Sequence, residues 1–192
     1  MKTRRILFSL LFCTTAFTLL SNCSGGKKAE PDDQQSQATG DEKSVEAAAP
    51  QFTVSENFQQ QLSQVFTSYV ALKEAFVASD SEKVKAEATA TGQVVSKVDM
   101  KLLSGAAHND WMNYLTPIQN SLKEIQDSSD IEEQRKAFST LSENLYKSIK
   151  AFGLADGEAF YEYCPMAFDN KGAYWLSDQT TIRNPYFGDA ML

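Results

Sequence analysis

The sequence predicts an all-α fold, an antiparallel four-helix bundle with an irregular aromatic-rich C-terminal cap. Three observations predict it. Between residues 54 and 152, four segments repeat apolar side chains three and four positions apart, the spacing of one helix face. Capping residues or glycines mark the ends of most segments. Four amphipathic helices of about 15 to 25 residues with short connections can bury their apolar faces by packing antiparallel.

An export signal precedes this domain, in residues 1–22. Three basic residues come before an apolar stretch from Ile6 to Leu20, which is too short to span a bilayer comfortably. The following Leu20-Ser-Asn-Cys23 resembles a bacterial lipoprotein cleavage box, so we expect Cys23 to carry the lipid anchor that makes the membrane a partner. The alternative is ordinary cleavage nearby, with Cys23 a free thiol. Either way the predicted location is the cell envelope, facing the periplasm or on the outer membrane.

Residues 23–50 predict a linker between the anchor and the domain. They are rich in Gly, Lys, Glu, Asp, Gln, Ser and Ala and hold no aromatic side chain. Such a stretch buries too little apolar area to offset its chain entropy, so it is expected to be disordered. The folded domain is therefore expected to span residues 51–192.

The first two helices follow from apolar spacing and capping signals. The first is predicted over residues 54–77, with Phe58, Leu62 and Tyr69 among its apolar positions. Ser79-Asp-Ser-Glu82 is a capping box that predicts the start of the second helix. This helix carries apolar residues as far as Leu102, and Gly105 is its expected stop.

The third and fourth helices follow in the same way. Asn109 or Asp110 can cap a third helix with apolar positions from Trp111 to Ile125. Pro117 is expected either to bend this helix or to mark its actual first turn. Ser129-Asp-Ile-Glu132 is a second capping box, and Gly153 is the expected stop of the fourth helix.

The pattern changes after Gly153. Residues 158–163 predict a short helical or extended lead-in, and the remainder is punctuated by prolines and glycines. Leaving so many aromatic rings in water would forfeit their burial free energy, so the segment is expected to pack as an ordered cap with Trp175 and Tyr186 as core anchors. The aromatic residues are Phe160, Tyr161, Tyr163, Phe168, Tyr174, Trp175, Tyr186 and Phe187.

The net charge and the residue types present argue against nucleic-acid binding and against enzymatic activity. The chain has a net charge of −7, and removal of residues 1–22 takes away three of 18 basic residues and none of 25 acidic ones, which leaves −10. Nucleic acid repels so acidic a domain. The single histidine, His108, and the absence of a nucleophile elbow, a phosphate loop or a haem motif predict that the protein is not an enzyme.

Cys164-Pro-Met166 is the pattern with most chemical content. A thiolate and a thioether on a proline-stiffened turn are soft donors, which favour monovalent copper or silver. Met191 is a third candidate ligand, and His108 a fourth if its loop lies at the same pole of the bundle. The alternative for each is structural, since cysteine and methionine commonly fill cores and a histidine in a loop is commonly solvated.

Several motifs resemble an exported bacterial domain of unknown function, largely of Bacteroidetes type, found alone or attached to adaptor subunits of copper and silver efflux systems. The C-terminal motifs are Tyr163-Cys-Pro-Met-Ala167, Gly172-Ala-Tyr-Trp-Leu-Ser177 and Ile182-Arg-Asn-Pro-Tyr-Phe-Gly-Asp189 with Met191. The helical part contributes Ala71-Leu-Lys-Glu-Ala-Phe-Val77 and Gln134-Arg-Lys-Ala-Phe-Ser139, so the resemblance covers about residues 54 to 192.

The resemblance implies a helical domain associated with heavy-metal handling, with Cys164, Met166 and Met191 at matched positions. Family members commonly continue to a Cys-Gly pair, whereas the sequence here ends at Leu192. If that cysteine completes the site, the resemblance implies weaker binding here or another donor such as His108. The expected function is a lipoprotein that sequesters a soft metal ion or passes it to an efflux adaptor. The competing expectation is a non-metal interaction module that docks an envelope protein through the aromatic cap.

Overall fold

The structure is a computed structural model, and it describes residues 49–188. The predicted signal peptide, Cys23, most of the predicted linker and Met191 lie outside the described residues. Within this range no helix is both long enough and apolar enough to cross a membrane.

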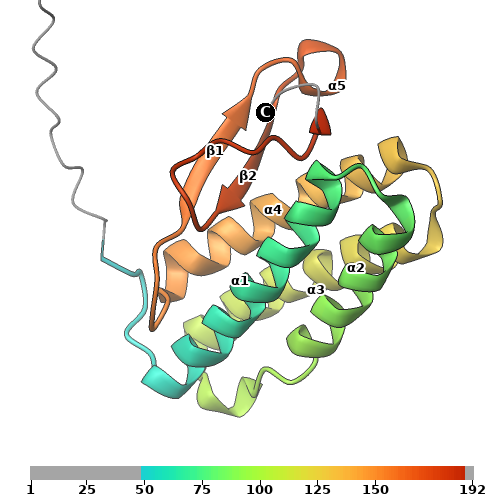
Figure 1. The fold of residues 1–192 in the computed structure, drawn as a ribbon. Helices are drawn as coiled ribbons and strands as arrows, with labels where there is room; N and C mark the ends of the chain where they lie inside the picture. The colour runs from blue at the N-terminus through green and yellow to red at the C-terminus, as the bar shows by residue number, and fades with distance from the viewer. Residues whose placement is uncertain (1–48, 189–192) are drawn as a thin grey trace, which may run out of the picture. The chain divides into compact units, whose positions relative to one another are not determined.

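The described chain is mostly helical, with four long helices packed against one another (Figure 1). Helix α1 packs on α2, α2 on α3, α3 on α4, and α1 also meets α4. One short helix and a turn of 3-10 helix complete the helical part of residues 49–188. The bounds are α1 Glu56–Val77, α2 Ser81–Val95, η1 Met100–Leu102, α3 Gly105–Asp127, α4 Ile131–Phe152 and α5 Ala167–Asn170.

Two of these helices begin within the predicted capping boxes, but the N-cap in each is the aspartate that follows the serine, Asp80 for α2 and Asp130 for α4. The Asp80 carboxylate accepts a bond from the Lys83 N–H at 3.0 Å at the start of α2. The Asp130 carboxylate accepts bonds from two backbone N–H groups at the start of α4, at 2.8 and 3.2 Å. Gly153, with φ 75°, ends α4 as predicted. Local side-chain chemistry therefore fixes these helix ends.

The connection between the second and third helices differs from the prediction. Helix α2 ends at Val95, and the chain then enters η1, whose N-cap Asp99 accepts a bond from the Lys101 N–H at 3.0 Å. Gly105 does not stop α2, because with φ 56° it is the first residue of α3. Helix α3 therefore begins before Asn109 and Asp110, and Pro117 lies inside it.

The predicted irregular cap contains a β-hairpin, so the prediction of a wholly helical domain is wrong for this segment. Strands β1 (Phe160–Cys164) and β2 (Ala173–Ser177) pair antiparallel, with Glu162 opposite Trp175 and Cys164 opposite Ala173. Aromatic side chains favour strands, and packing on the helices supplies the stability that an isolated hairpin lacks.

The hairpin lies on α1 and α4, with β2 against α4 and β1 outermost (Figure 1). Trp175 and Tyr186 are buried in the same core as the apolar faces of the long helices, which confirms both as core anchors. The segment after β2 returns toward the first turn of α4, where Pro185 accepts a bond from the Arg135 Nε at 3.0 Å. One continuous core thus holds the hairpin and the helices together.

Candidate functional site

Cys164 and Met166 lie at the end of the hairpin that is farthest from the connection between α4 and β1. Cys164 is the last residue of β1 and is 3% exposed. Met166 follows Pro165, caps the short helix α5 and is 49% exposed. The structure therefore brings the two predicted ligands to one turn, with one sulfur side chain in the core and the other at the surface.

The turn after Met166 has an unusual backbone. Phe168, Asp169 and Asn170 are three consecutive non-glycine residues in the left-handed region, with φ of 53°, 58° and 64°. This conformation costs roughly 1–2 kcal/mol per residue. The Phe168 ring packs on Tyr186 at 5.4 Å between centroids, and the Gly172 N–H donates to the Ala167 carbonyl at 3.0 Å. These contacts hold the strained turn, here called the hairpin tip (residues 165–172).

A cavity of about 870 Å³ separates the hairpin tip from the first turns of α4. Its lining is mixed, with Met166 and Phe168 beside charged side chains from α4. Arg135 is fixed there, because it donates to the Pro185 carbonyl and to Ser79 Oγ, each at 3.0 Å, and pairs with Glu132. Met166 is therefore reachable from solvent beside a charged wall.

His108 lies far from this cavity. It sits in the first turn of α3, one turn before Trp111, whose ring is 6.1 Å from that of Phe152 at the end of α4. Arg135, which lines the cavity, lies at the other end of α4, about 25 Å away at a rise of about 1.5 Å per residue. The structure does not bring His108 together with Cys164 and Met166.

No other group of ligands takes the place of His108. Within residues 49–188 no group of three or more His, Cys, Asp or Glu side chains is placed to hold a metal ion. Met191 lies outside the described residues. Gly188, three positions earlier, lies close to Ser79 and to Arg135, which lines the cavity. The soft donors that the described residues offer at the tip are one thiol and one thioether, from Cys164 and Met166.

Four tyrosine rings contact one another in series beside the tip, and this tyrosine stack is a feature that the sequence did not predict. Tyr146 of α4 stacks on Tyr161 at 3.8 Å and Tyr161 on Tyr174 at 4.6 Å between ring centroids. The Tyr163 ring contacts Tyr174 at 4.5 Å with its plane tilted by 36°. Burial, together with Tyr146, Glu143 and Tyr174, raises the pKa of Tyr161 to about 12. Tyr163 and Tyr174 are 47% and 45% exposed, so this end of the tyrosine stack is open to solvent.

A buried charge cluster ties the hairpin and the C-terminal segment to α1. Lys73 is 1% exposed, and its Nζ lies 2.7 Å from Glu74 Oε1. The other oxygen of Glu74 accepts from the Arg183 Nε at 2.9 Å and lies 2.8 Å from its Nη2. Partial burial raises the pKa of Glu74, but the bonds from Arg183 and Lys73 outweigh burial and lower it overall. Apolar spacing predicts no such cluster, because Lys73 reads as a solvated position.

Glu162 is the fourth charged group of this cluster. Burial raises the pKa of Glu162 more than the nearby Lys73 and the indole of Trp175 lower it. Neither Glu162 Oε2 nor Trp175 Nε1 has a hydrogen bond of normal geometry. The charged form of Glu162 is therefore incompletely compensated in the folded protein.

This arrangement predicts that Glu162→Gln stabilises the folded protein to an extent that depends on pH. Because the folded pKa lies above the ordinary 4.5, Glu162 lowers the free energy of unfolding as pH rises from about 4.5 through the folded pKa. We expect the melting temperature of the variant to exceed that of the parent at pH 7 and to converge with it at pH 4. The exposed Glu158→Gln is the matched control. An equal difference at both pH values would contradict the assignment.

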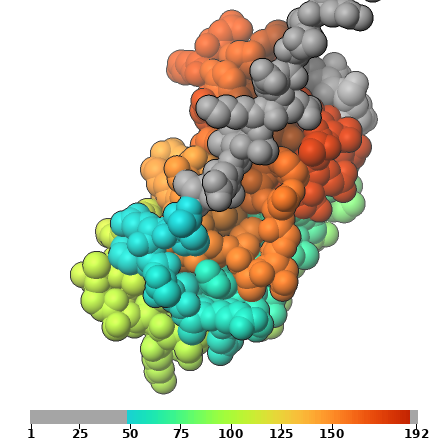
Figure 2. Space-filling view, turned by 90° about the vertical axis from the view of Figure 1, so that its left-hand side faces the viewer, coloured from blue at the N-terminus to red at the C-terminus, as the bar shows by residue number. Residues whose placement is uncertain are grey.

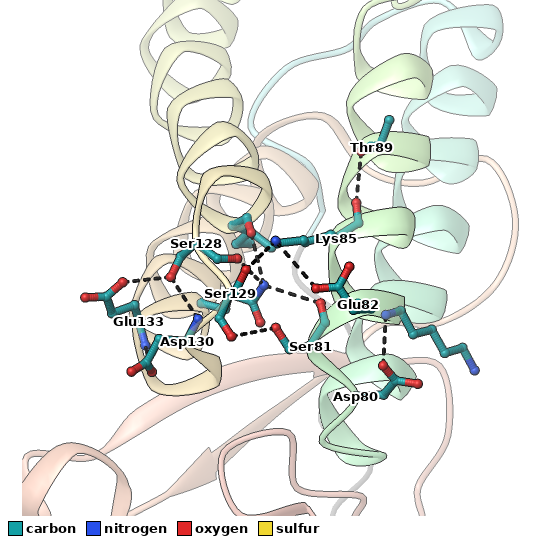
Figure 3. A network of polar contacts seen from close by, with 12 residues as sticks. Asp80, Ser81, Glu82, Lys85, Thr89, Ser128, Ser129, Asp130 and Glu133 are labelled. Carbon is teal, nitrogen blue, oxygen red and sulfur yellow. Dashed lines mark hydrogen bonds and ion pairs between the residues drawn. The ribbon is translucent and has the colours of Figure 1, made fainter.

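A second polar network joins the starts of α2 and α4 (Figure 3). Lys85 Nζ donates to Ser129 Oγ at 2.6 Å, and Ser81 Oγ donates to the Ser129 carbonyl at 2.9 Å. The buried Gln134 amide donates to the Ile125 and Ser128 carbonyls at 3.2 and 2.8 Å. These bonds satisfy helix ends and fix two connections to each other, which is an architectural role.

Residues 65–157 match a protein family described as Protein of unknown function (DUF3347). The match begins within α1 and ends just after α4, before the hairpin. It confirms the resemblance to a domain of unknown function for these residues. No curated protein and no solved structure matches the chain.

Proposed function

We propose that the chain is a lipid-anchored, periplasm-facing envelope protein that binds monovalent copper or silver through Cys164 and Met166. The carrying observation is that one turn brings the two sulfur residues together. Cys164 ends β1 in the core, and Met166, two residues later, is half exposed and lines the cavity. The bound ion would be sequestered or passed to a heavy-metal efflux adaptor.

The geometry gives the two sulfurs different roles. Met166 faces the cavity and offers the first soft donor that an entering ion meets. Cys164 lies behind it in the core, where a thiolate would need the positive charge of the ion to compensate for its burial. Met191 follows Phe187 of the cavity lining by four residues, a stretch that spans at most roughly 14 Å. Met191 therefore joins the proposal as a third donor, and His108 leaves it.

The finer fold assignment is part of the same proposal. Consecutive packing of α1 on α2, α2 on α3 and α3 on α4 supports an antiparallel four-helix bundle. The bundle serves as a rigid support on which α1 and α4 position the hairpin.

Titration of the purified protein with monovalent copper under reducing, anaerobic conditions tests the metal assignment. Cys164→Ser and Met166→Leu are each expected to weaken binding by more than about tenfold. Loss of a residue that only supports a metal ligand already lowers metal affinity by about that factor. Met112→Leu is the matched control, because Met112 is a similarly exposed methionine on α3. Unchanged affinity in both sulfur variants would refute the proposal.

A second candidate function is supported by the open end of the tyrosine stack and by the burial of Cys164. In this alternative the aromatic cap is a docking surface for an envelope protein, and Cys164 only fills the core. A ligand that binds only the folded state raises the melting temperature. Monovalent copper should therefore raise the melting temperature if the first candidate is correct and leave it unchanged if only the second is.

A further inference from the structure

The two outer edges of the hairpin differ in their hydrogen bonding. The Leu176 N–H of β2 donates to the Tyr69 hydroxyl at 3.1 Å, and the Tyr186 hydroxyl donates to the Tyr174 carbonyl at 2.6 Å. Two tyrosine hydroxyls from outside the sheet thus satisfy two of the four outward backbone groups of Tyr174 and Leu176 on the β2 edge. The rest of the protein therefore partly covers this edge.

The strand register shows what happens at the β1 edge. In an antiparallel pair, the N–H and C=O of one residue point to the same side of the strand. Because Tyr174 and Leu176 direct theirs away from β1, their partners Tyr163 and Tyr161 direct theirs away from β2. Among residues 49–188 none bonds to these four backbone groups of Tyr161 and Tyr163. Within the described part of the chain, the β1 edge is therefore open to pairing.

Figure 2 shows the molecule from the side on which β1 lies in Figure 1, and orange parts of the chain reach the surface there. The side chain of Tyr163 on β1 is 47% exposed. Exposed strand edges are normally protected by charged side chains, proline or a covering segment. On β1 the single charged residue, Glu162, takes part in the cluster with Lys73. Nothing in the strand itself opposes the addition of another strand.

Charge and aromatic side chains indicate which strand fits this edge. Besides Glu162, which faces Lys73, residues 154–170 contain the carboxylates of Asp156, Glu158 and Asp169 and no lysine or arginine, and Lys171 follows them. The exposed rings of Tyr163 and Tyr174 lie beside the edge. Arginine and lysine are attracted both to carboxylates and to tyrosine faces. The surface is therefore complementary to an extended segment that carries positive charge.

We propose that the outer edge of β1 binds an extended cationic segment of a partner protein, which adds to the hairpin as a third strand. The backbone groups of Tyr161 and Tyr163 supply four hydrogen bonds, which fix the register. Basic side chains of the segment lie against the carboxylates and the open end of the tyrosine stack. This inference rests on the second candidate function, and it names the edge and the chemistry of the partner.

The test uses a synthetic ten-residue peptide of alternating arginine and valine, added to the metal-free protein and followed by NMR. We expect saturable binding and slowed amide exchange at Tyr161 and Tyr163. Tyr163→Pro removes one outward N–H, a change that an edge strand tolerates, and should weaken binding at least tenfold. Tyr163→Thr keeps that N–H, so its affinity for the peptide should fall less than that of Tyr163→Pro. Near-ultraviolet circular dichroism verifies that the hairpin of each variant is folded.

A second measurement does not depend on any variant. The same peptide with alternate amides methylated along its pairing edge should not bind, and the peptide with glutamate in place of arginine should bind at least tenfold more weakly. Equal binding of the methylated peptide, or unchanged exchange at Tyr161 and Tyr163, overturns the edge assignment while leaving an interaction surface elsewhere. Protection of these amides without peptide, together with a dimer in sedimentation velocity, overturns it in favour of a second copy of the chain.

Discussion

Trp175→Ala is expected to lower the free energy of unfolding by about 3–5 kcal/mol, the usual loss for a fully buried tryptophan. The Trp175 side chain is 1% exposed and packs edge-to-face on Tyr186 at 6.0 Å between ring centroids. Its loss leaves a cavity between β2 and Tyr186 of the C-terminal segment. Urea unfolding followed by circular dichroism at 222 nm measures the effect.

The neighbouring Tyr174→Ala is the matched control for this prediction. Tyr174 belongs to the same strand, but its ring is 45% exposed and contacts Tyr161 and Tyr163 on the opposite face. Loss of those ring contacts is worth only about 0.5–1.5 kcal/mol per pair. If the two variants lose equal stability, Trp175 does not anchor the hairpin to the core.

The helical part of the fold could be predicted because its signals are local. The caps Asp80 and Asp130 act on N–H groups two or three residues away, and Gly153 ends α4 through its own backbone angle. The error around Gly105 has the same origin, because a glycine with positive φ ends one helix or begins another depending on its neighbours. Short-range chemistry therefore gave the helices but not every boundary.

The hairpin could not be predicted because distant residues stabilise it. Tyr69 of α1 bonds to Leu176, which is 107 positions away in the chain. The left-handed backbone at Phe168 depends on packing against Tyr186. The sequence of β1 also lacks the apolar/polar alternation of a half-buried strand. On one face Tyr161 stacks on Tyr146 of α4, and on the other face a charged residue, Glu162, points toward Lys73.

The candidate site shows the same division. Cys164 and Met166 are two residues apart, so their proximity follows from sequence alone. His108 is a candidate from sequence only if its loop lies at the same pole of the bundle as the sulfurs. Strand β1 then runs back along α4 and carries Cys164 to the opposite end, beside Arg135. Only the direction of that strand separates His108 from the sulfurs.

Tyr69→Phe isolates the contribution of one hydroxyl to hairpin docking. Tyr69 is completely buried, and burial together with Tyr186 raises its pKa well above the ordinary value, so the hydroxyl is neutral. Ser142 Oγ donates to the Phe138 carbonyl at 2.8 Å, so the Tyr69 hydroxyl donates to Ser142 Oγ at 2.7 Å while accepting from the Leu176 N–H. Phenylalanine leaves that N–H buried without an acceptor.

We expect Tyr69→Phe to lower the free energy of unfolding by about 1–3 kcal/mol, the desolvation cost of one buried unsatisfied group. Hydrogen exchange should rise most at Leu176, because the loss falls on the β2 edge. Tyr114→Phe is the control, since the Tyr114 ring packs on Phe152 at the far end of α4 and is only partly buried. A uniform rise in exchange over all helices would show that Tyr69 stabilises the whole core instead of docking the hairpin.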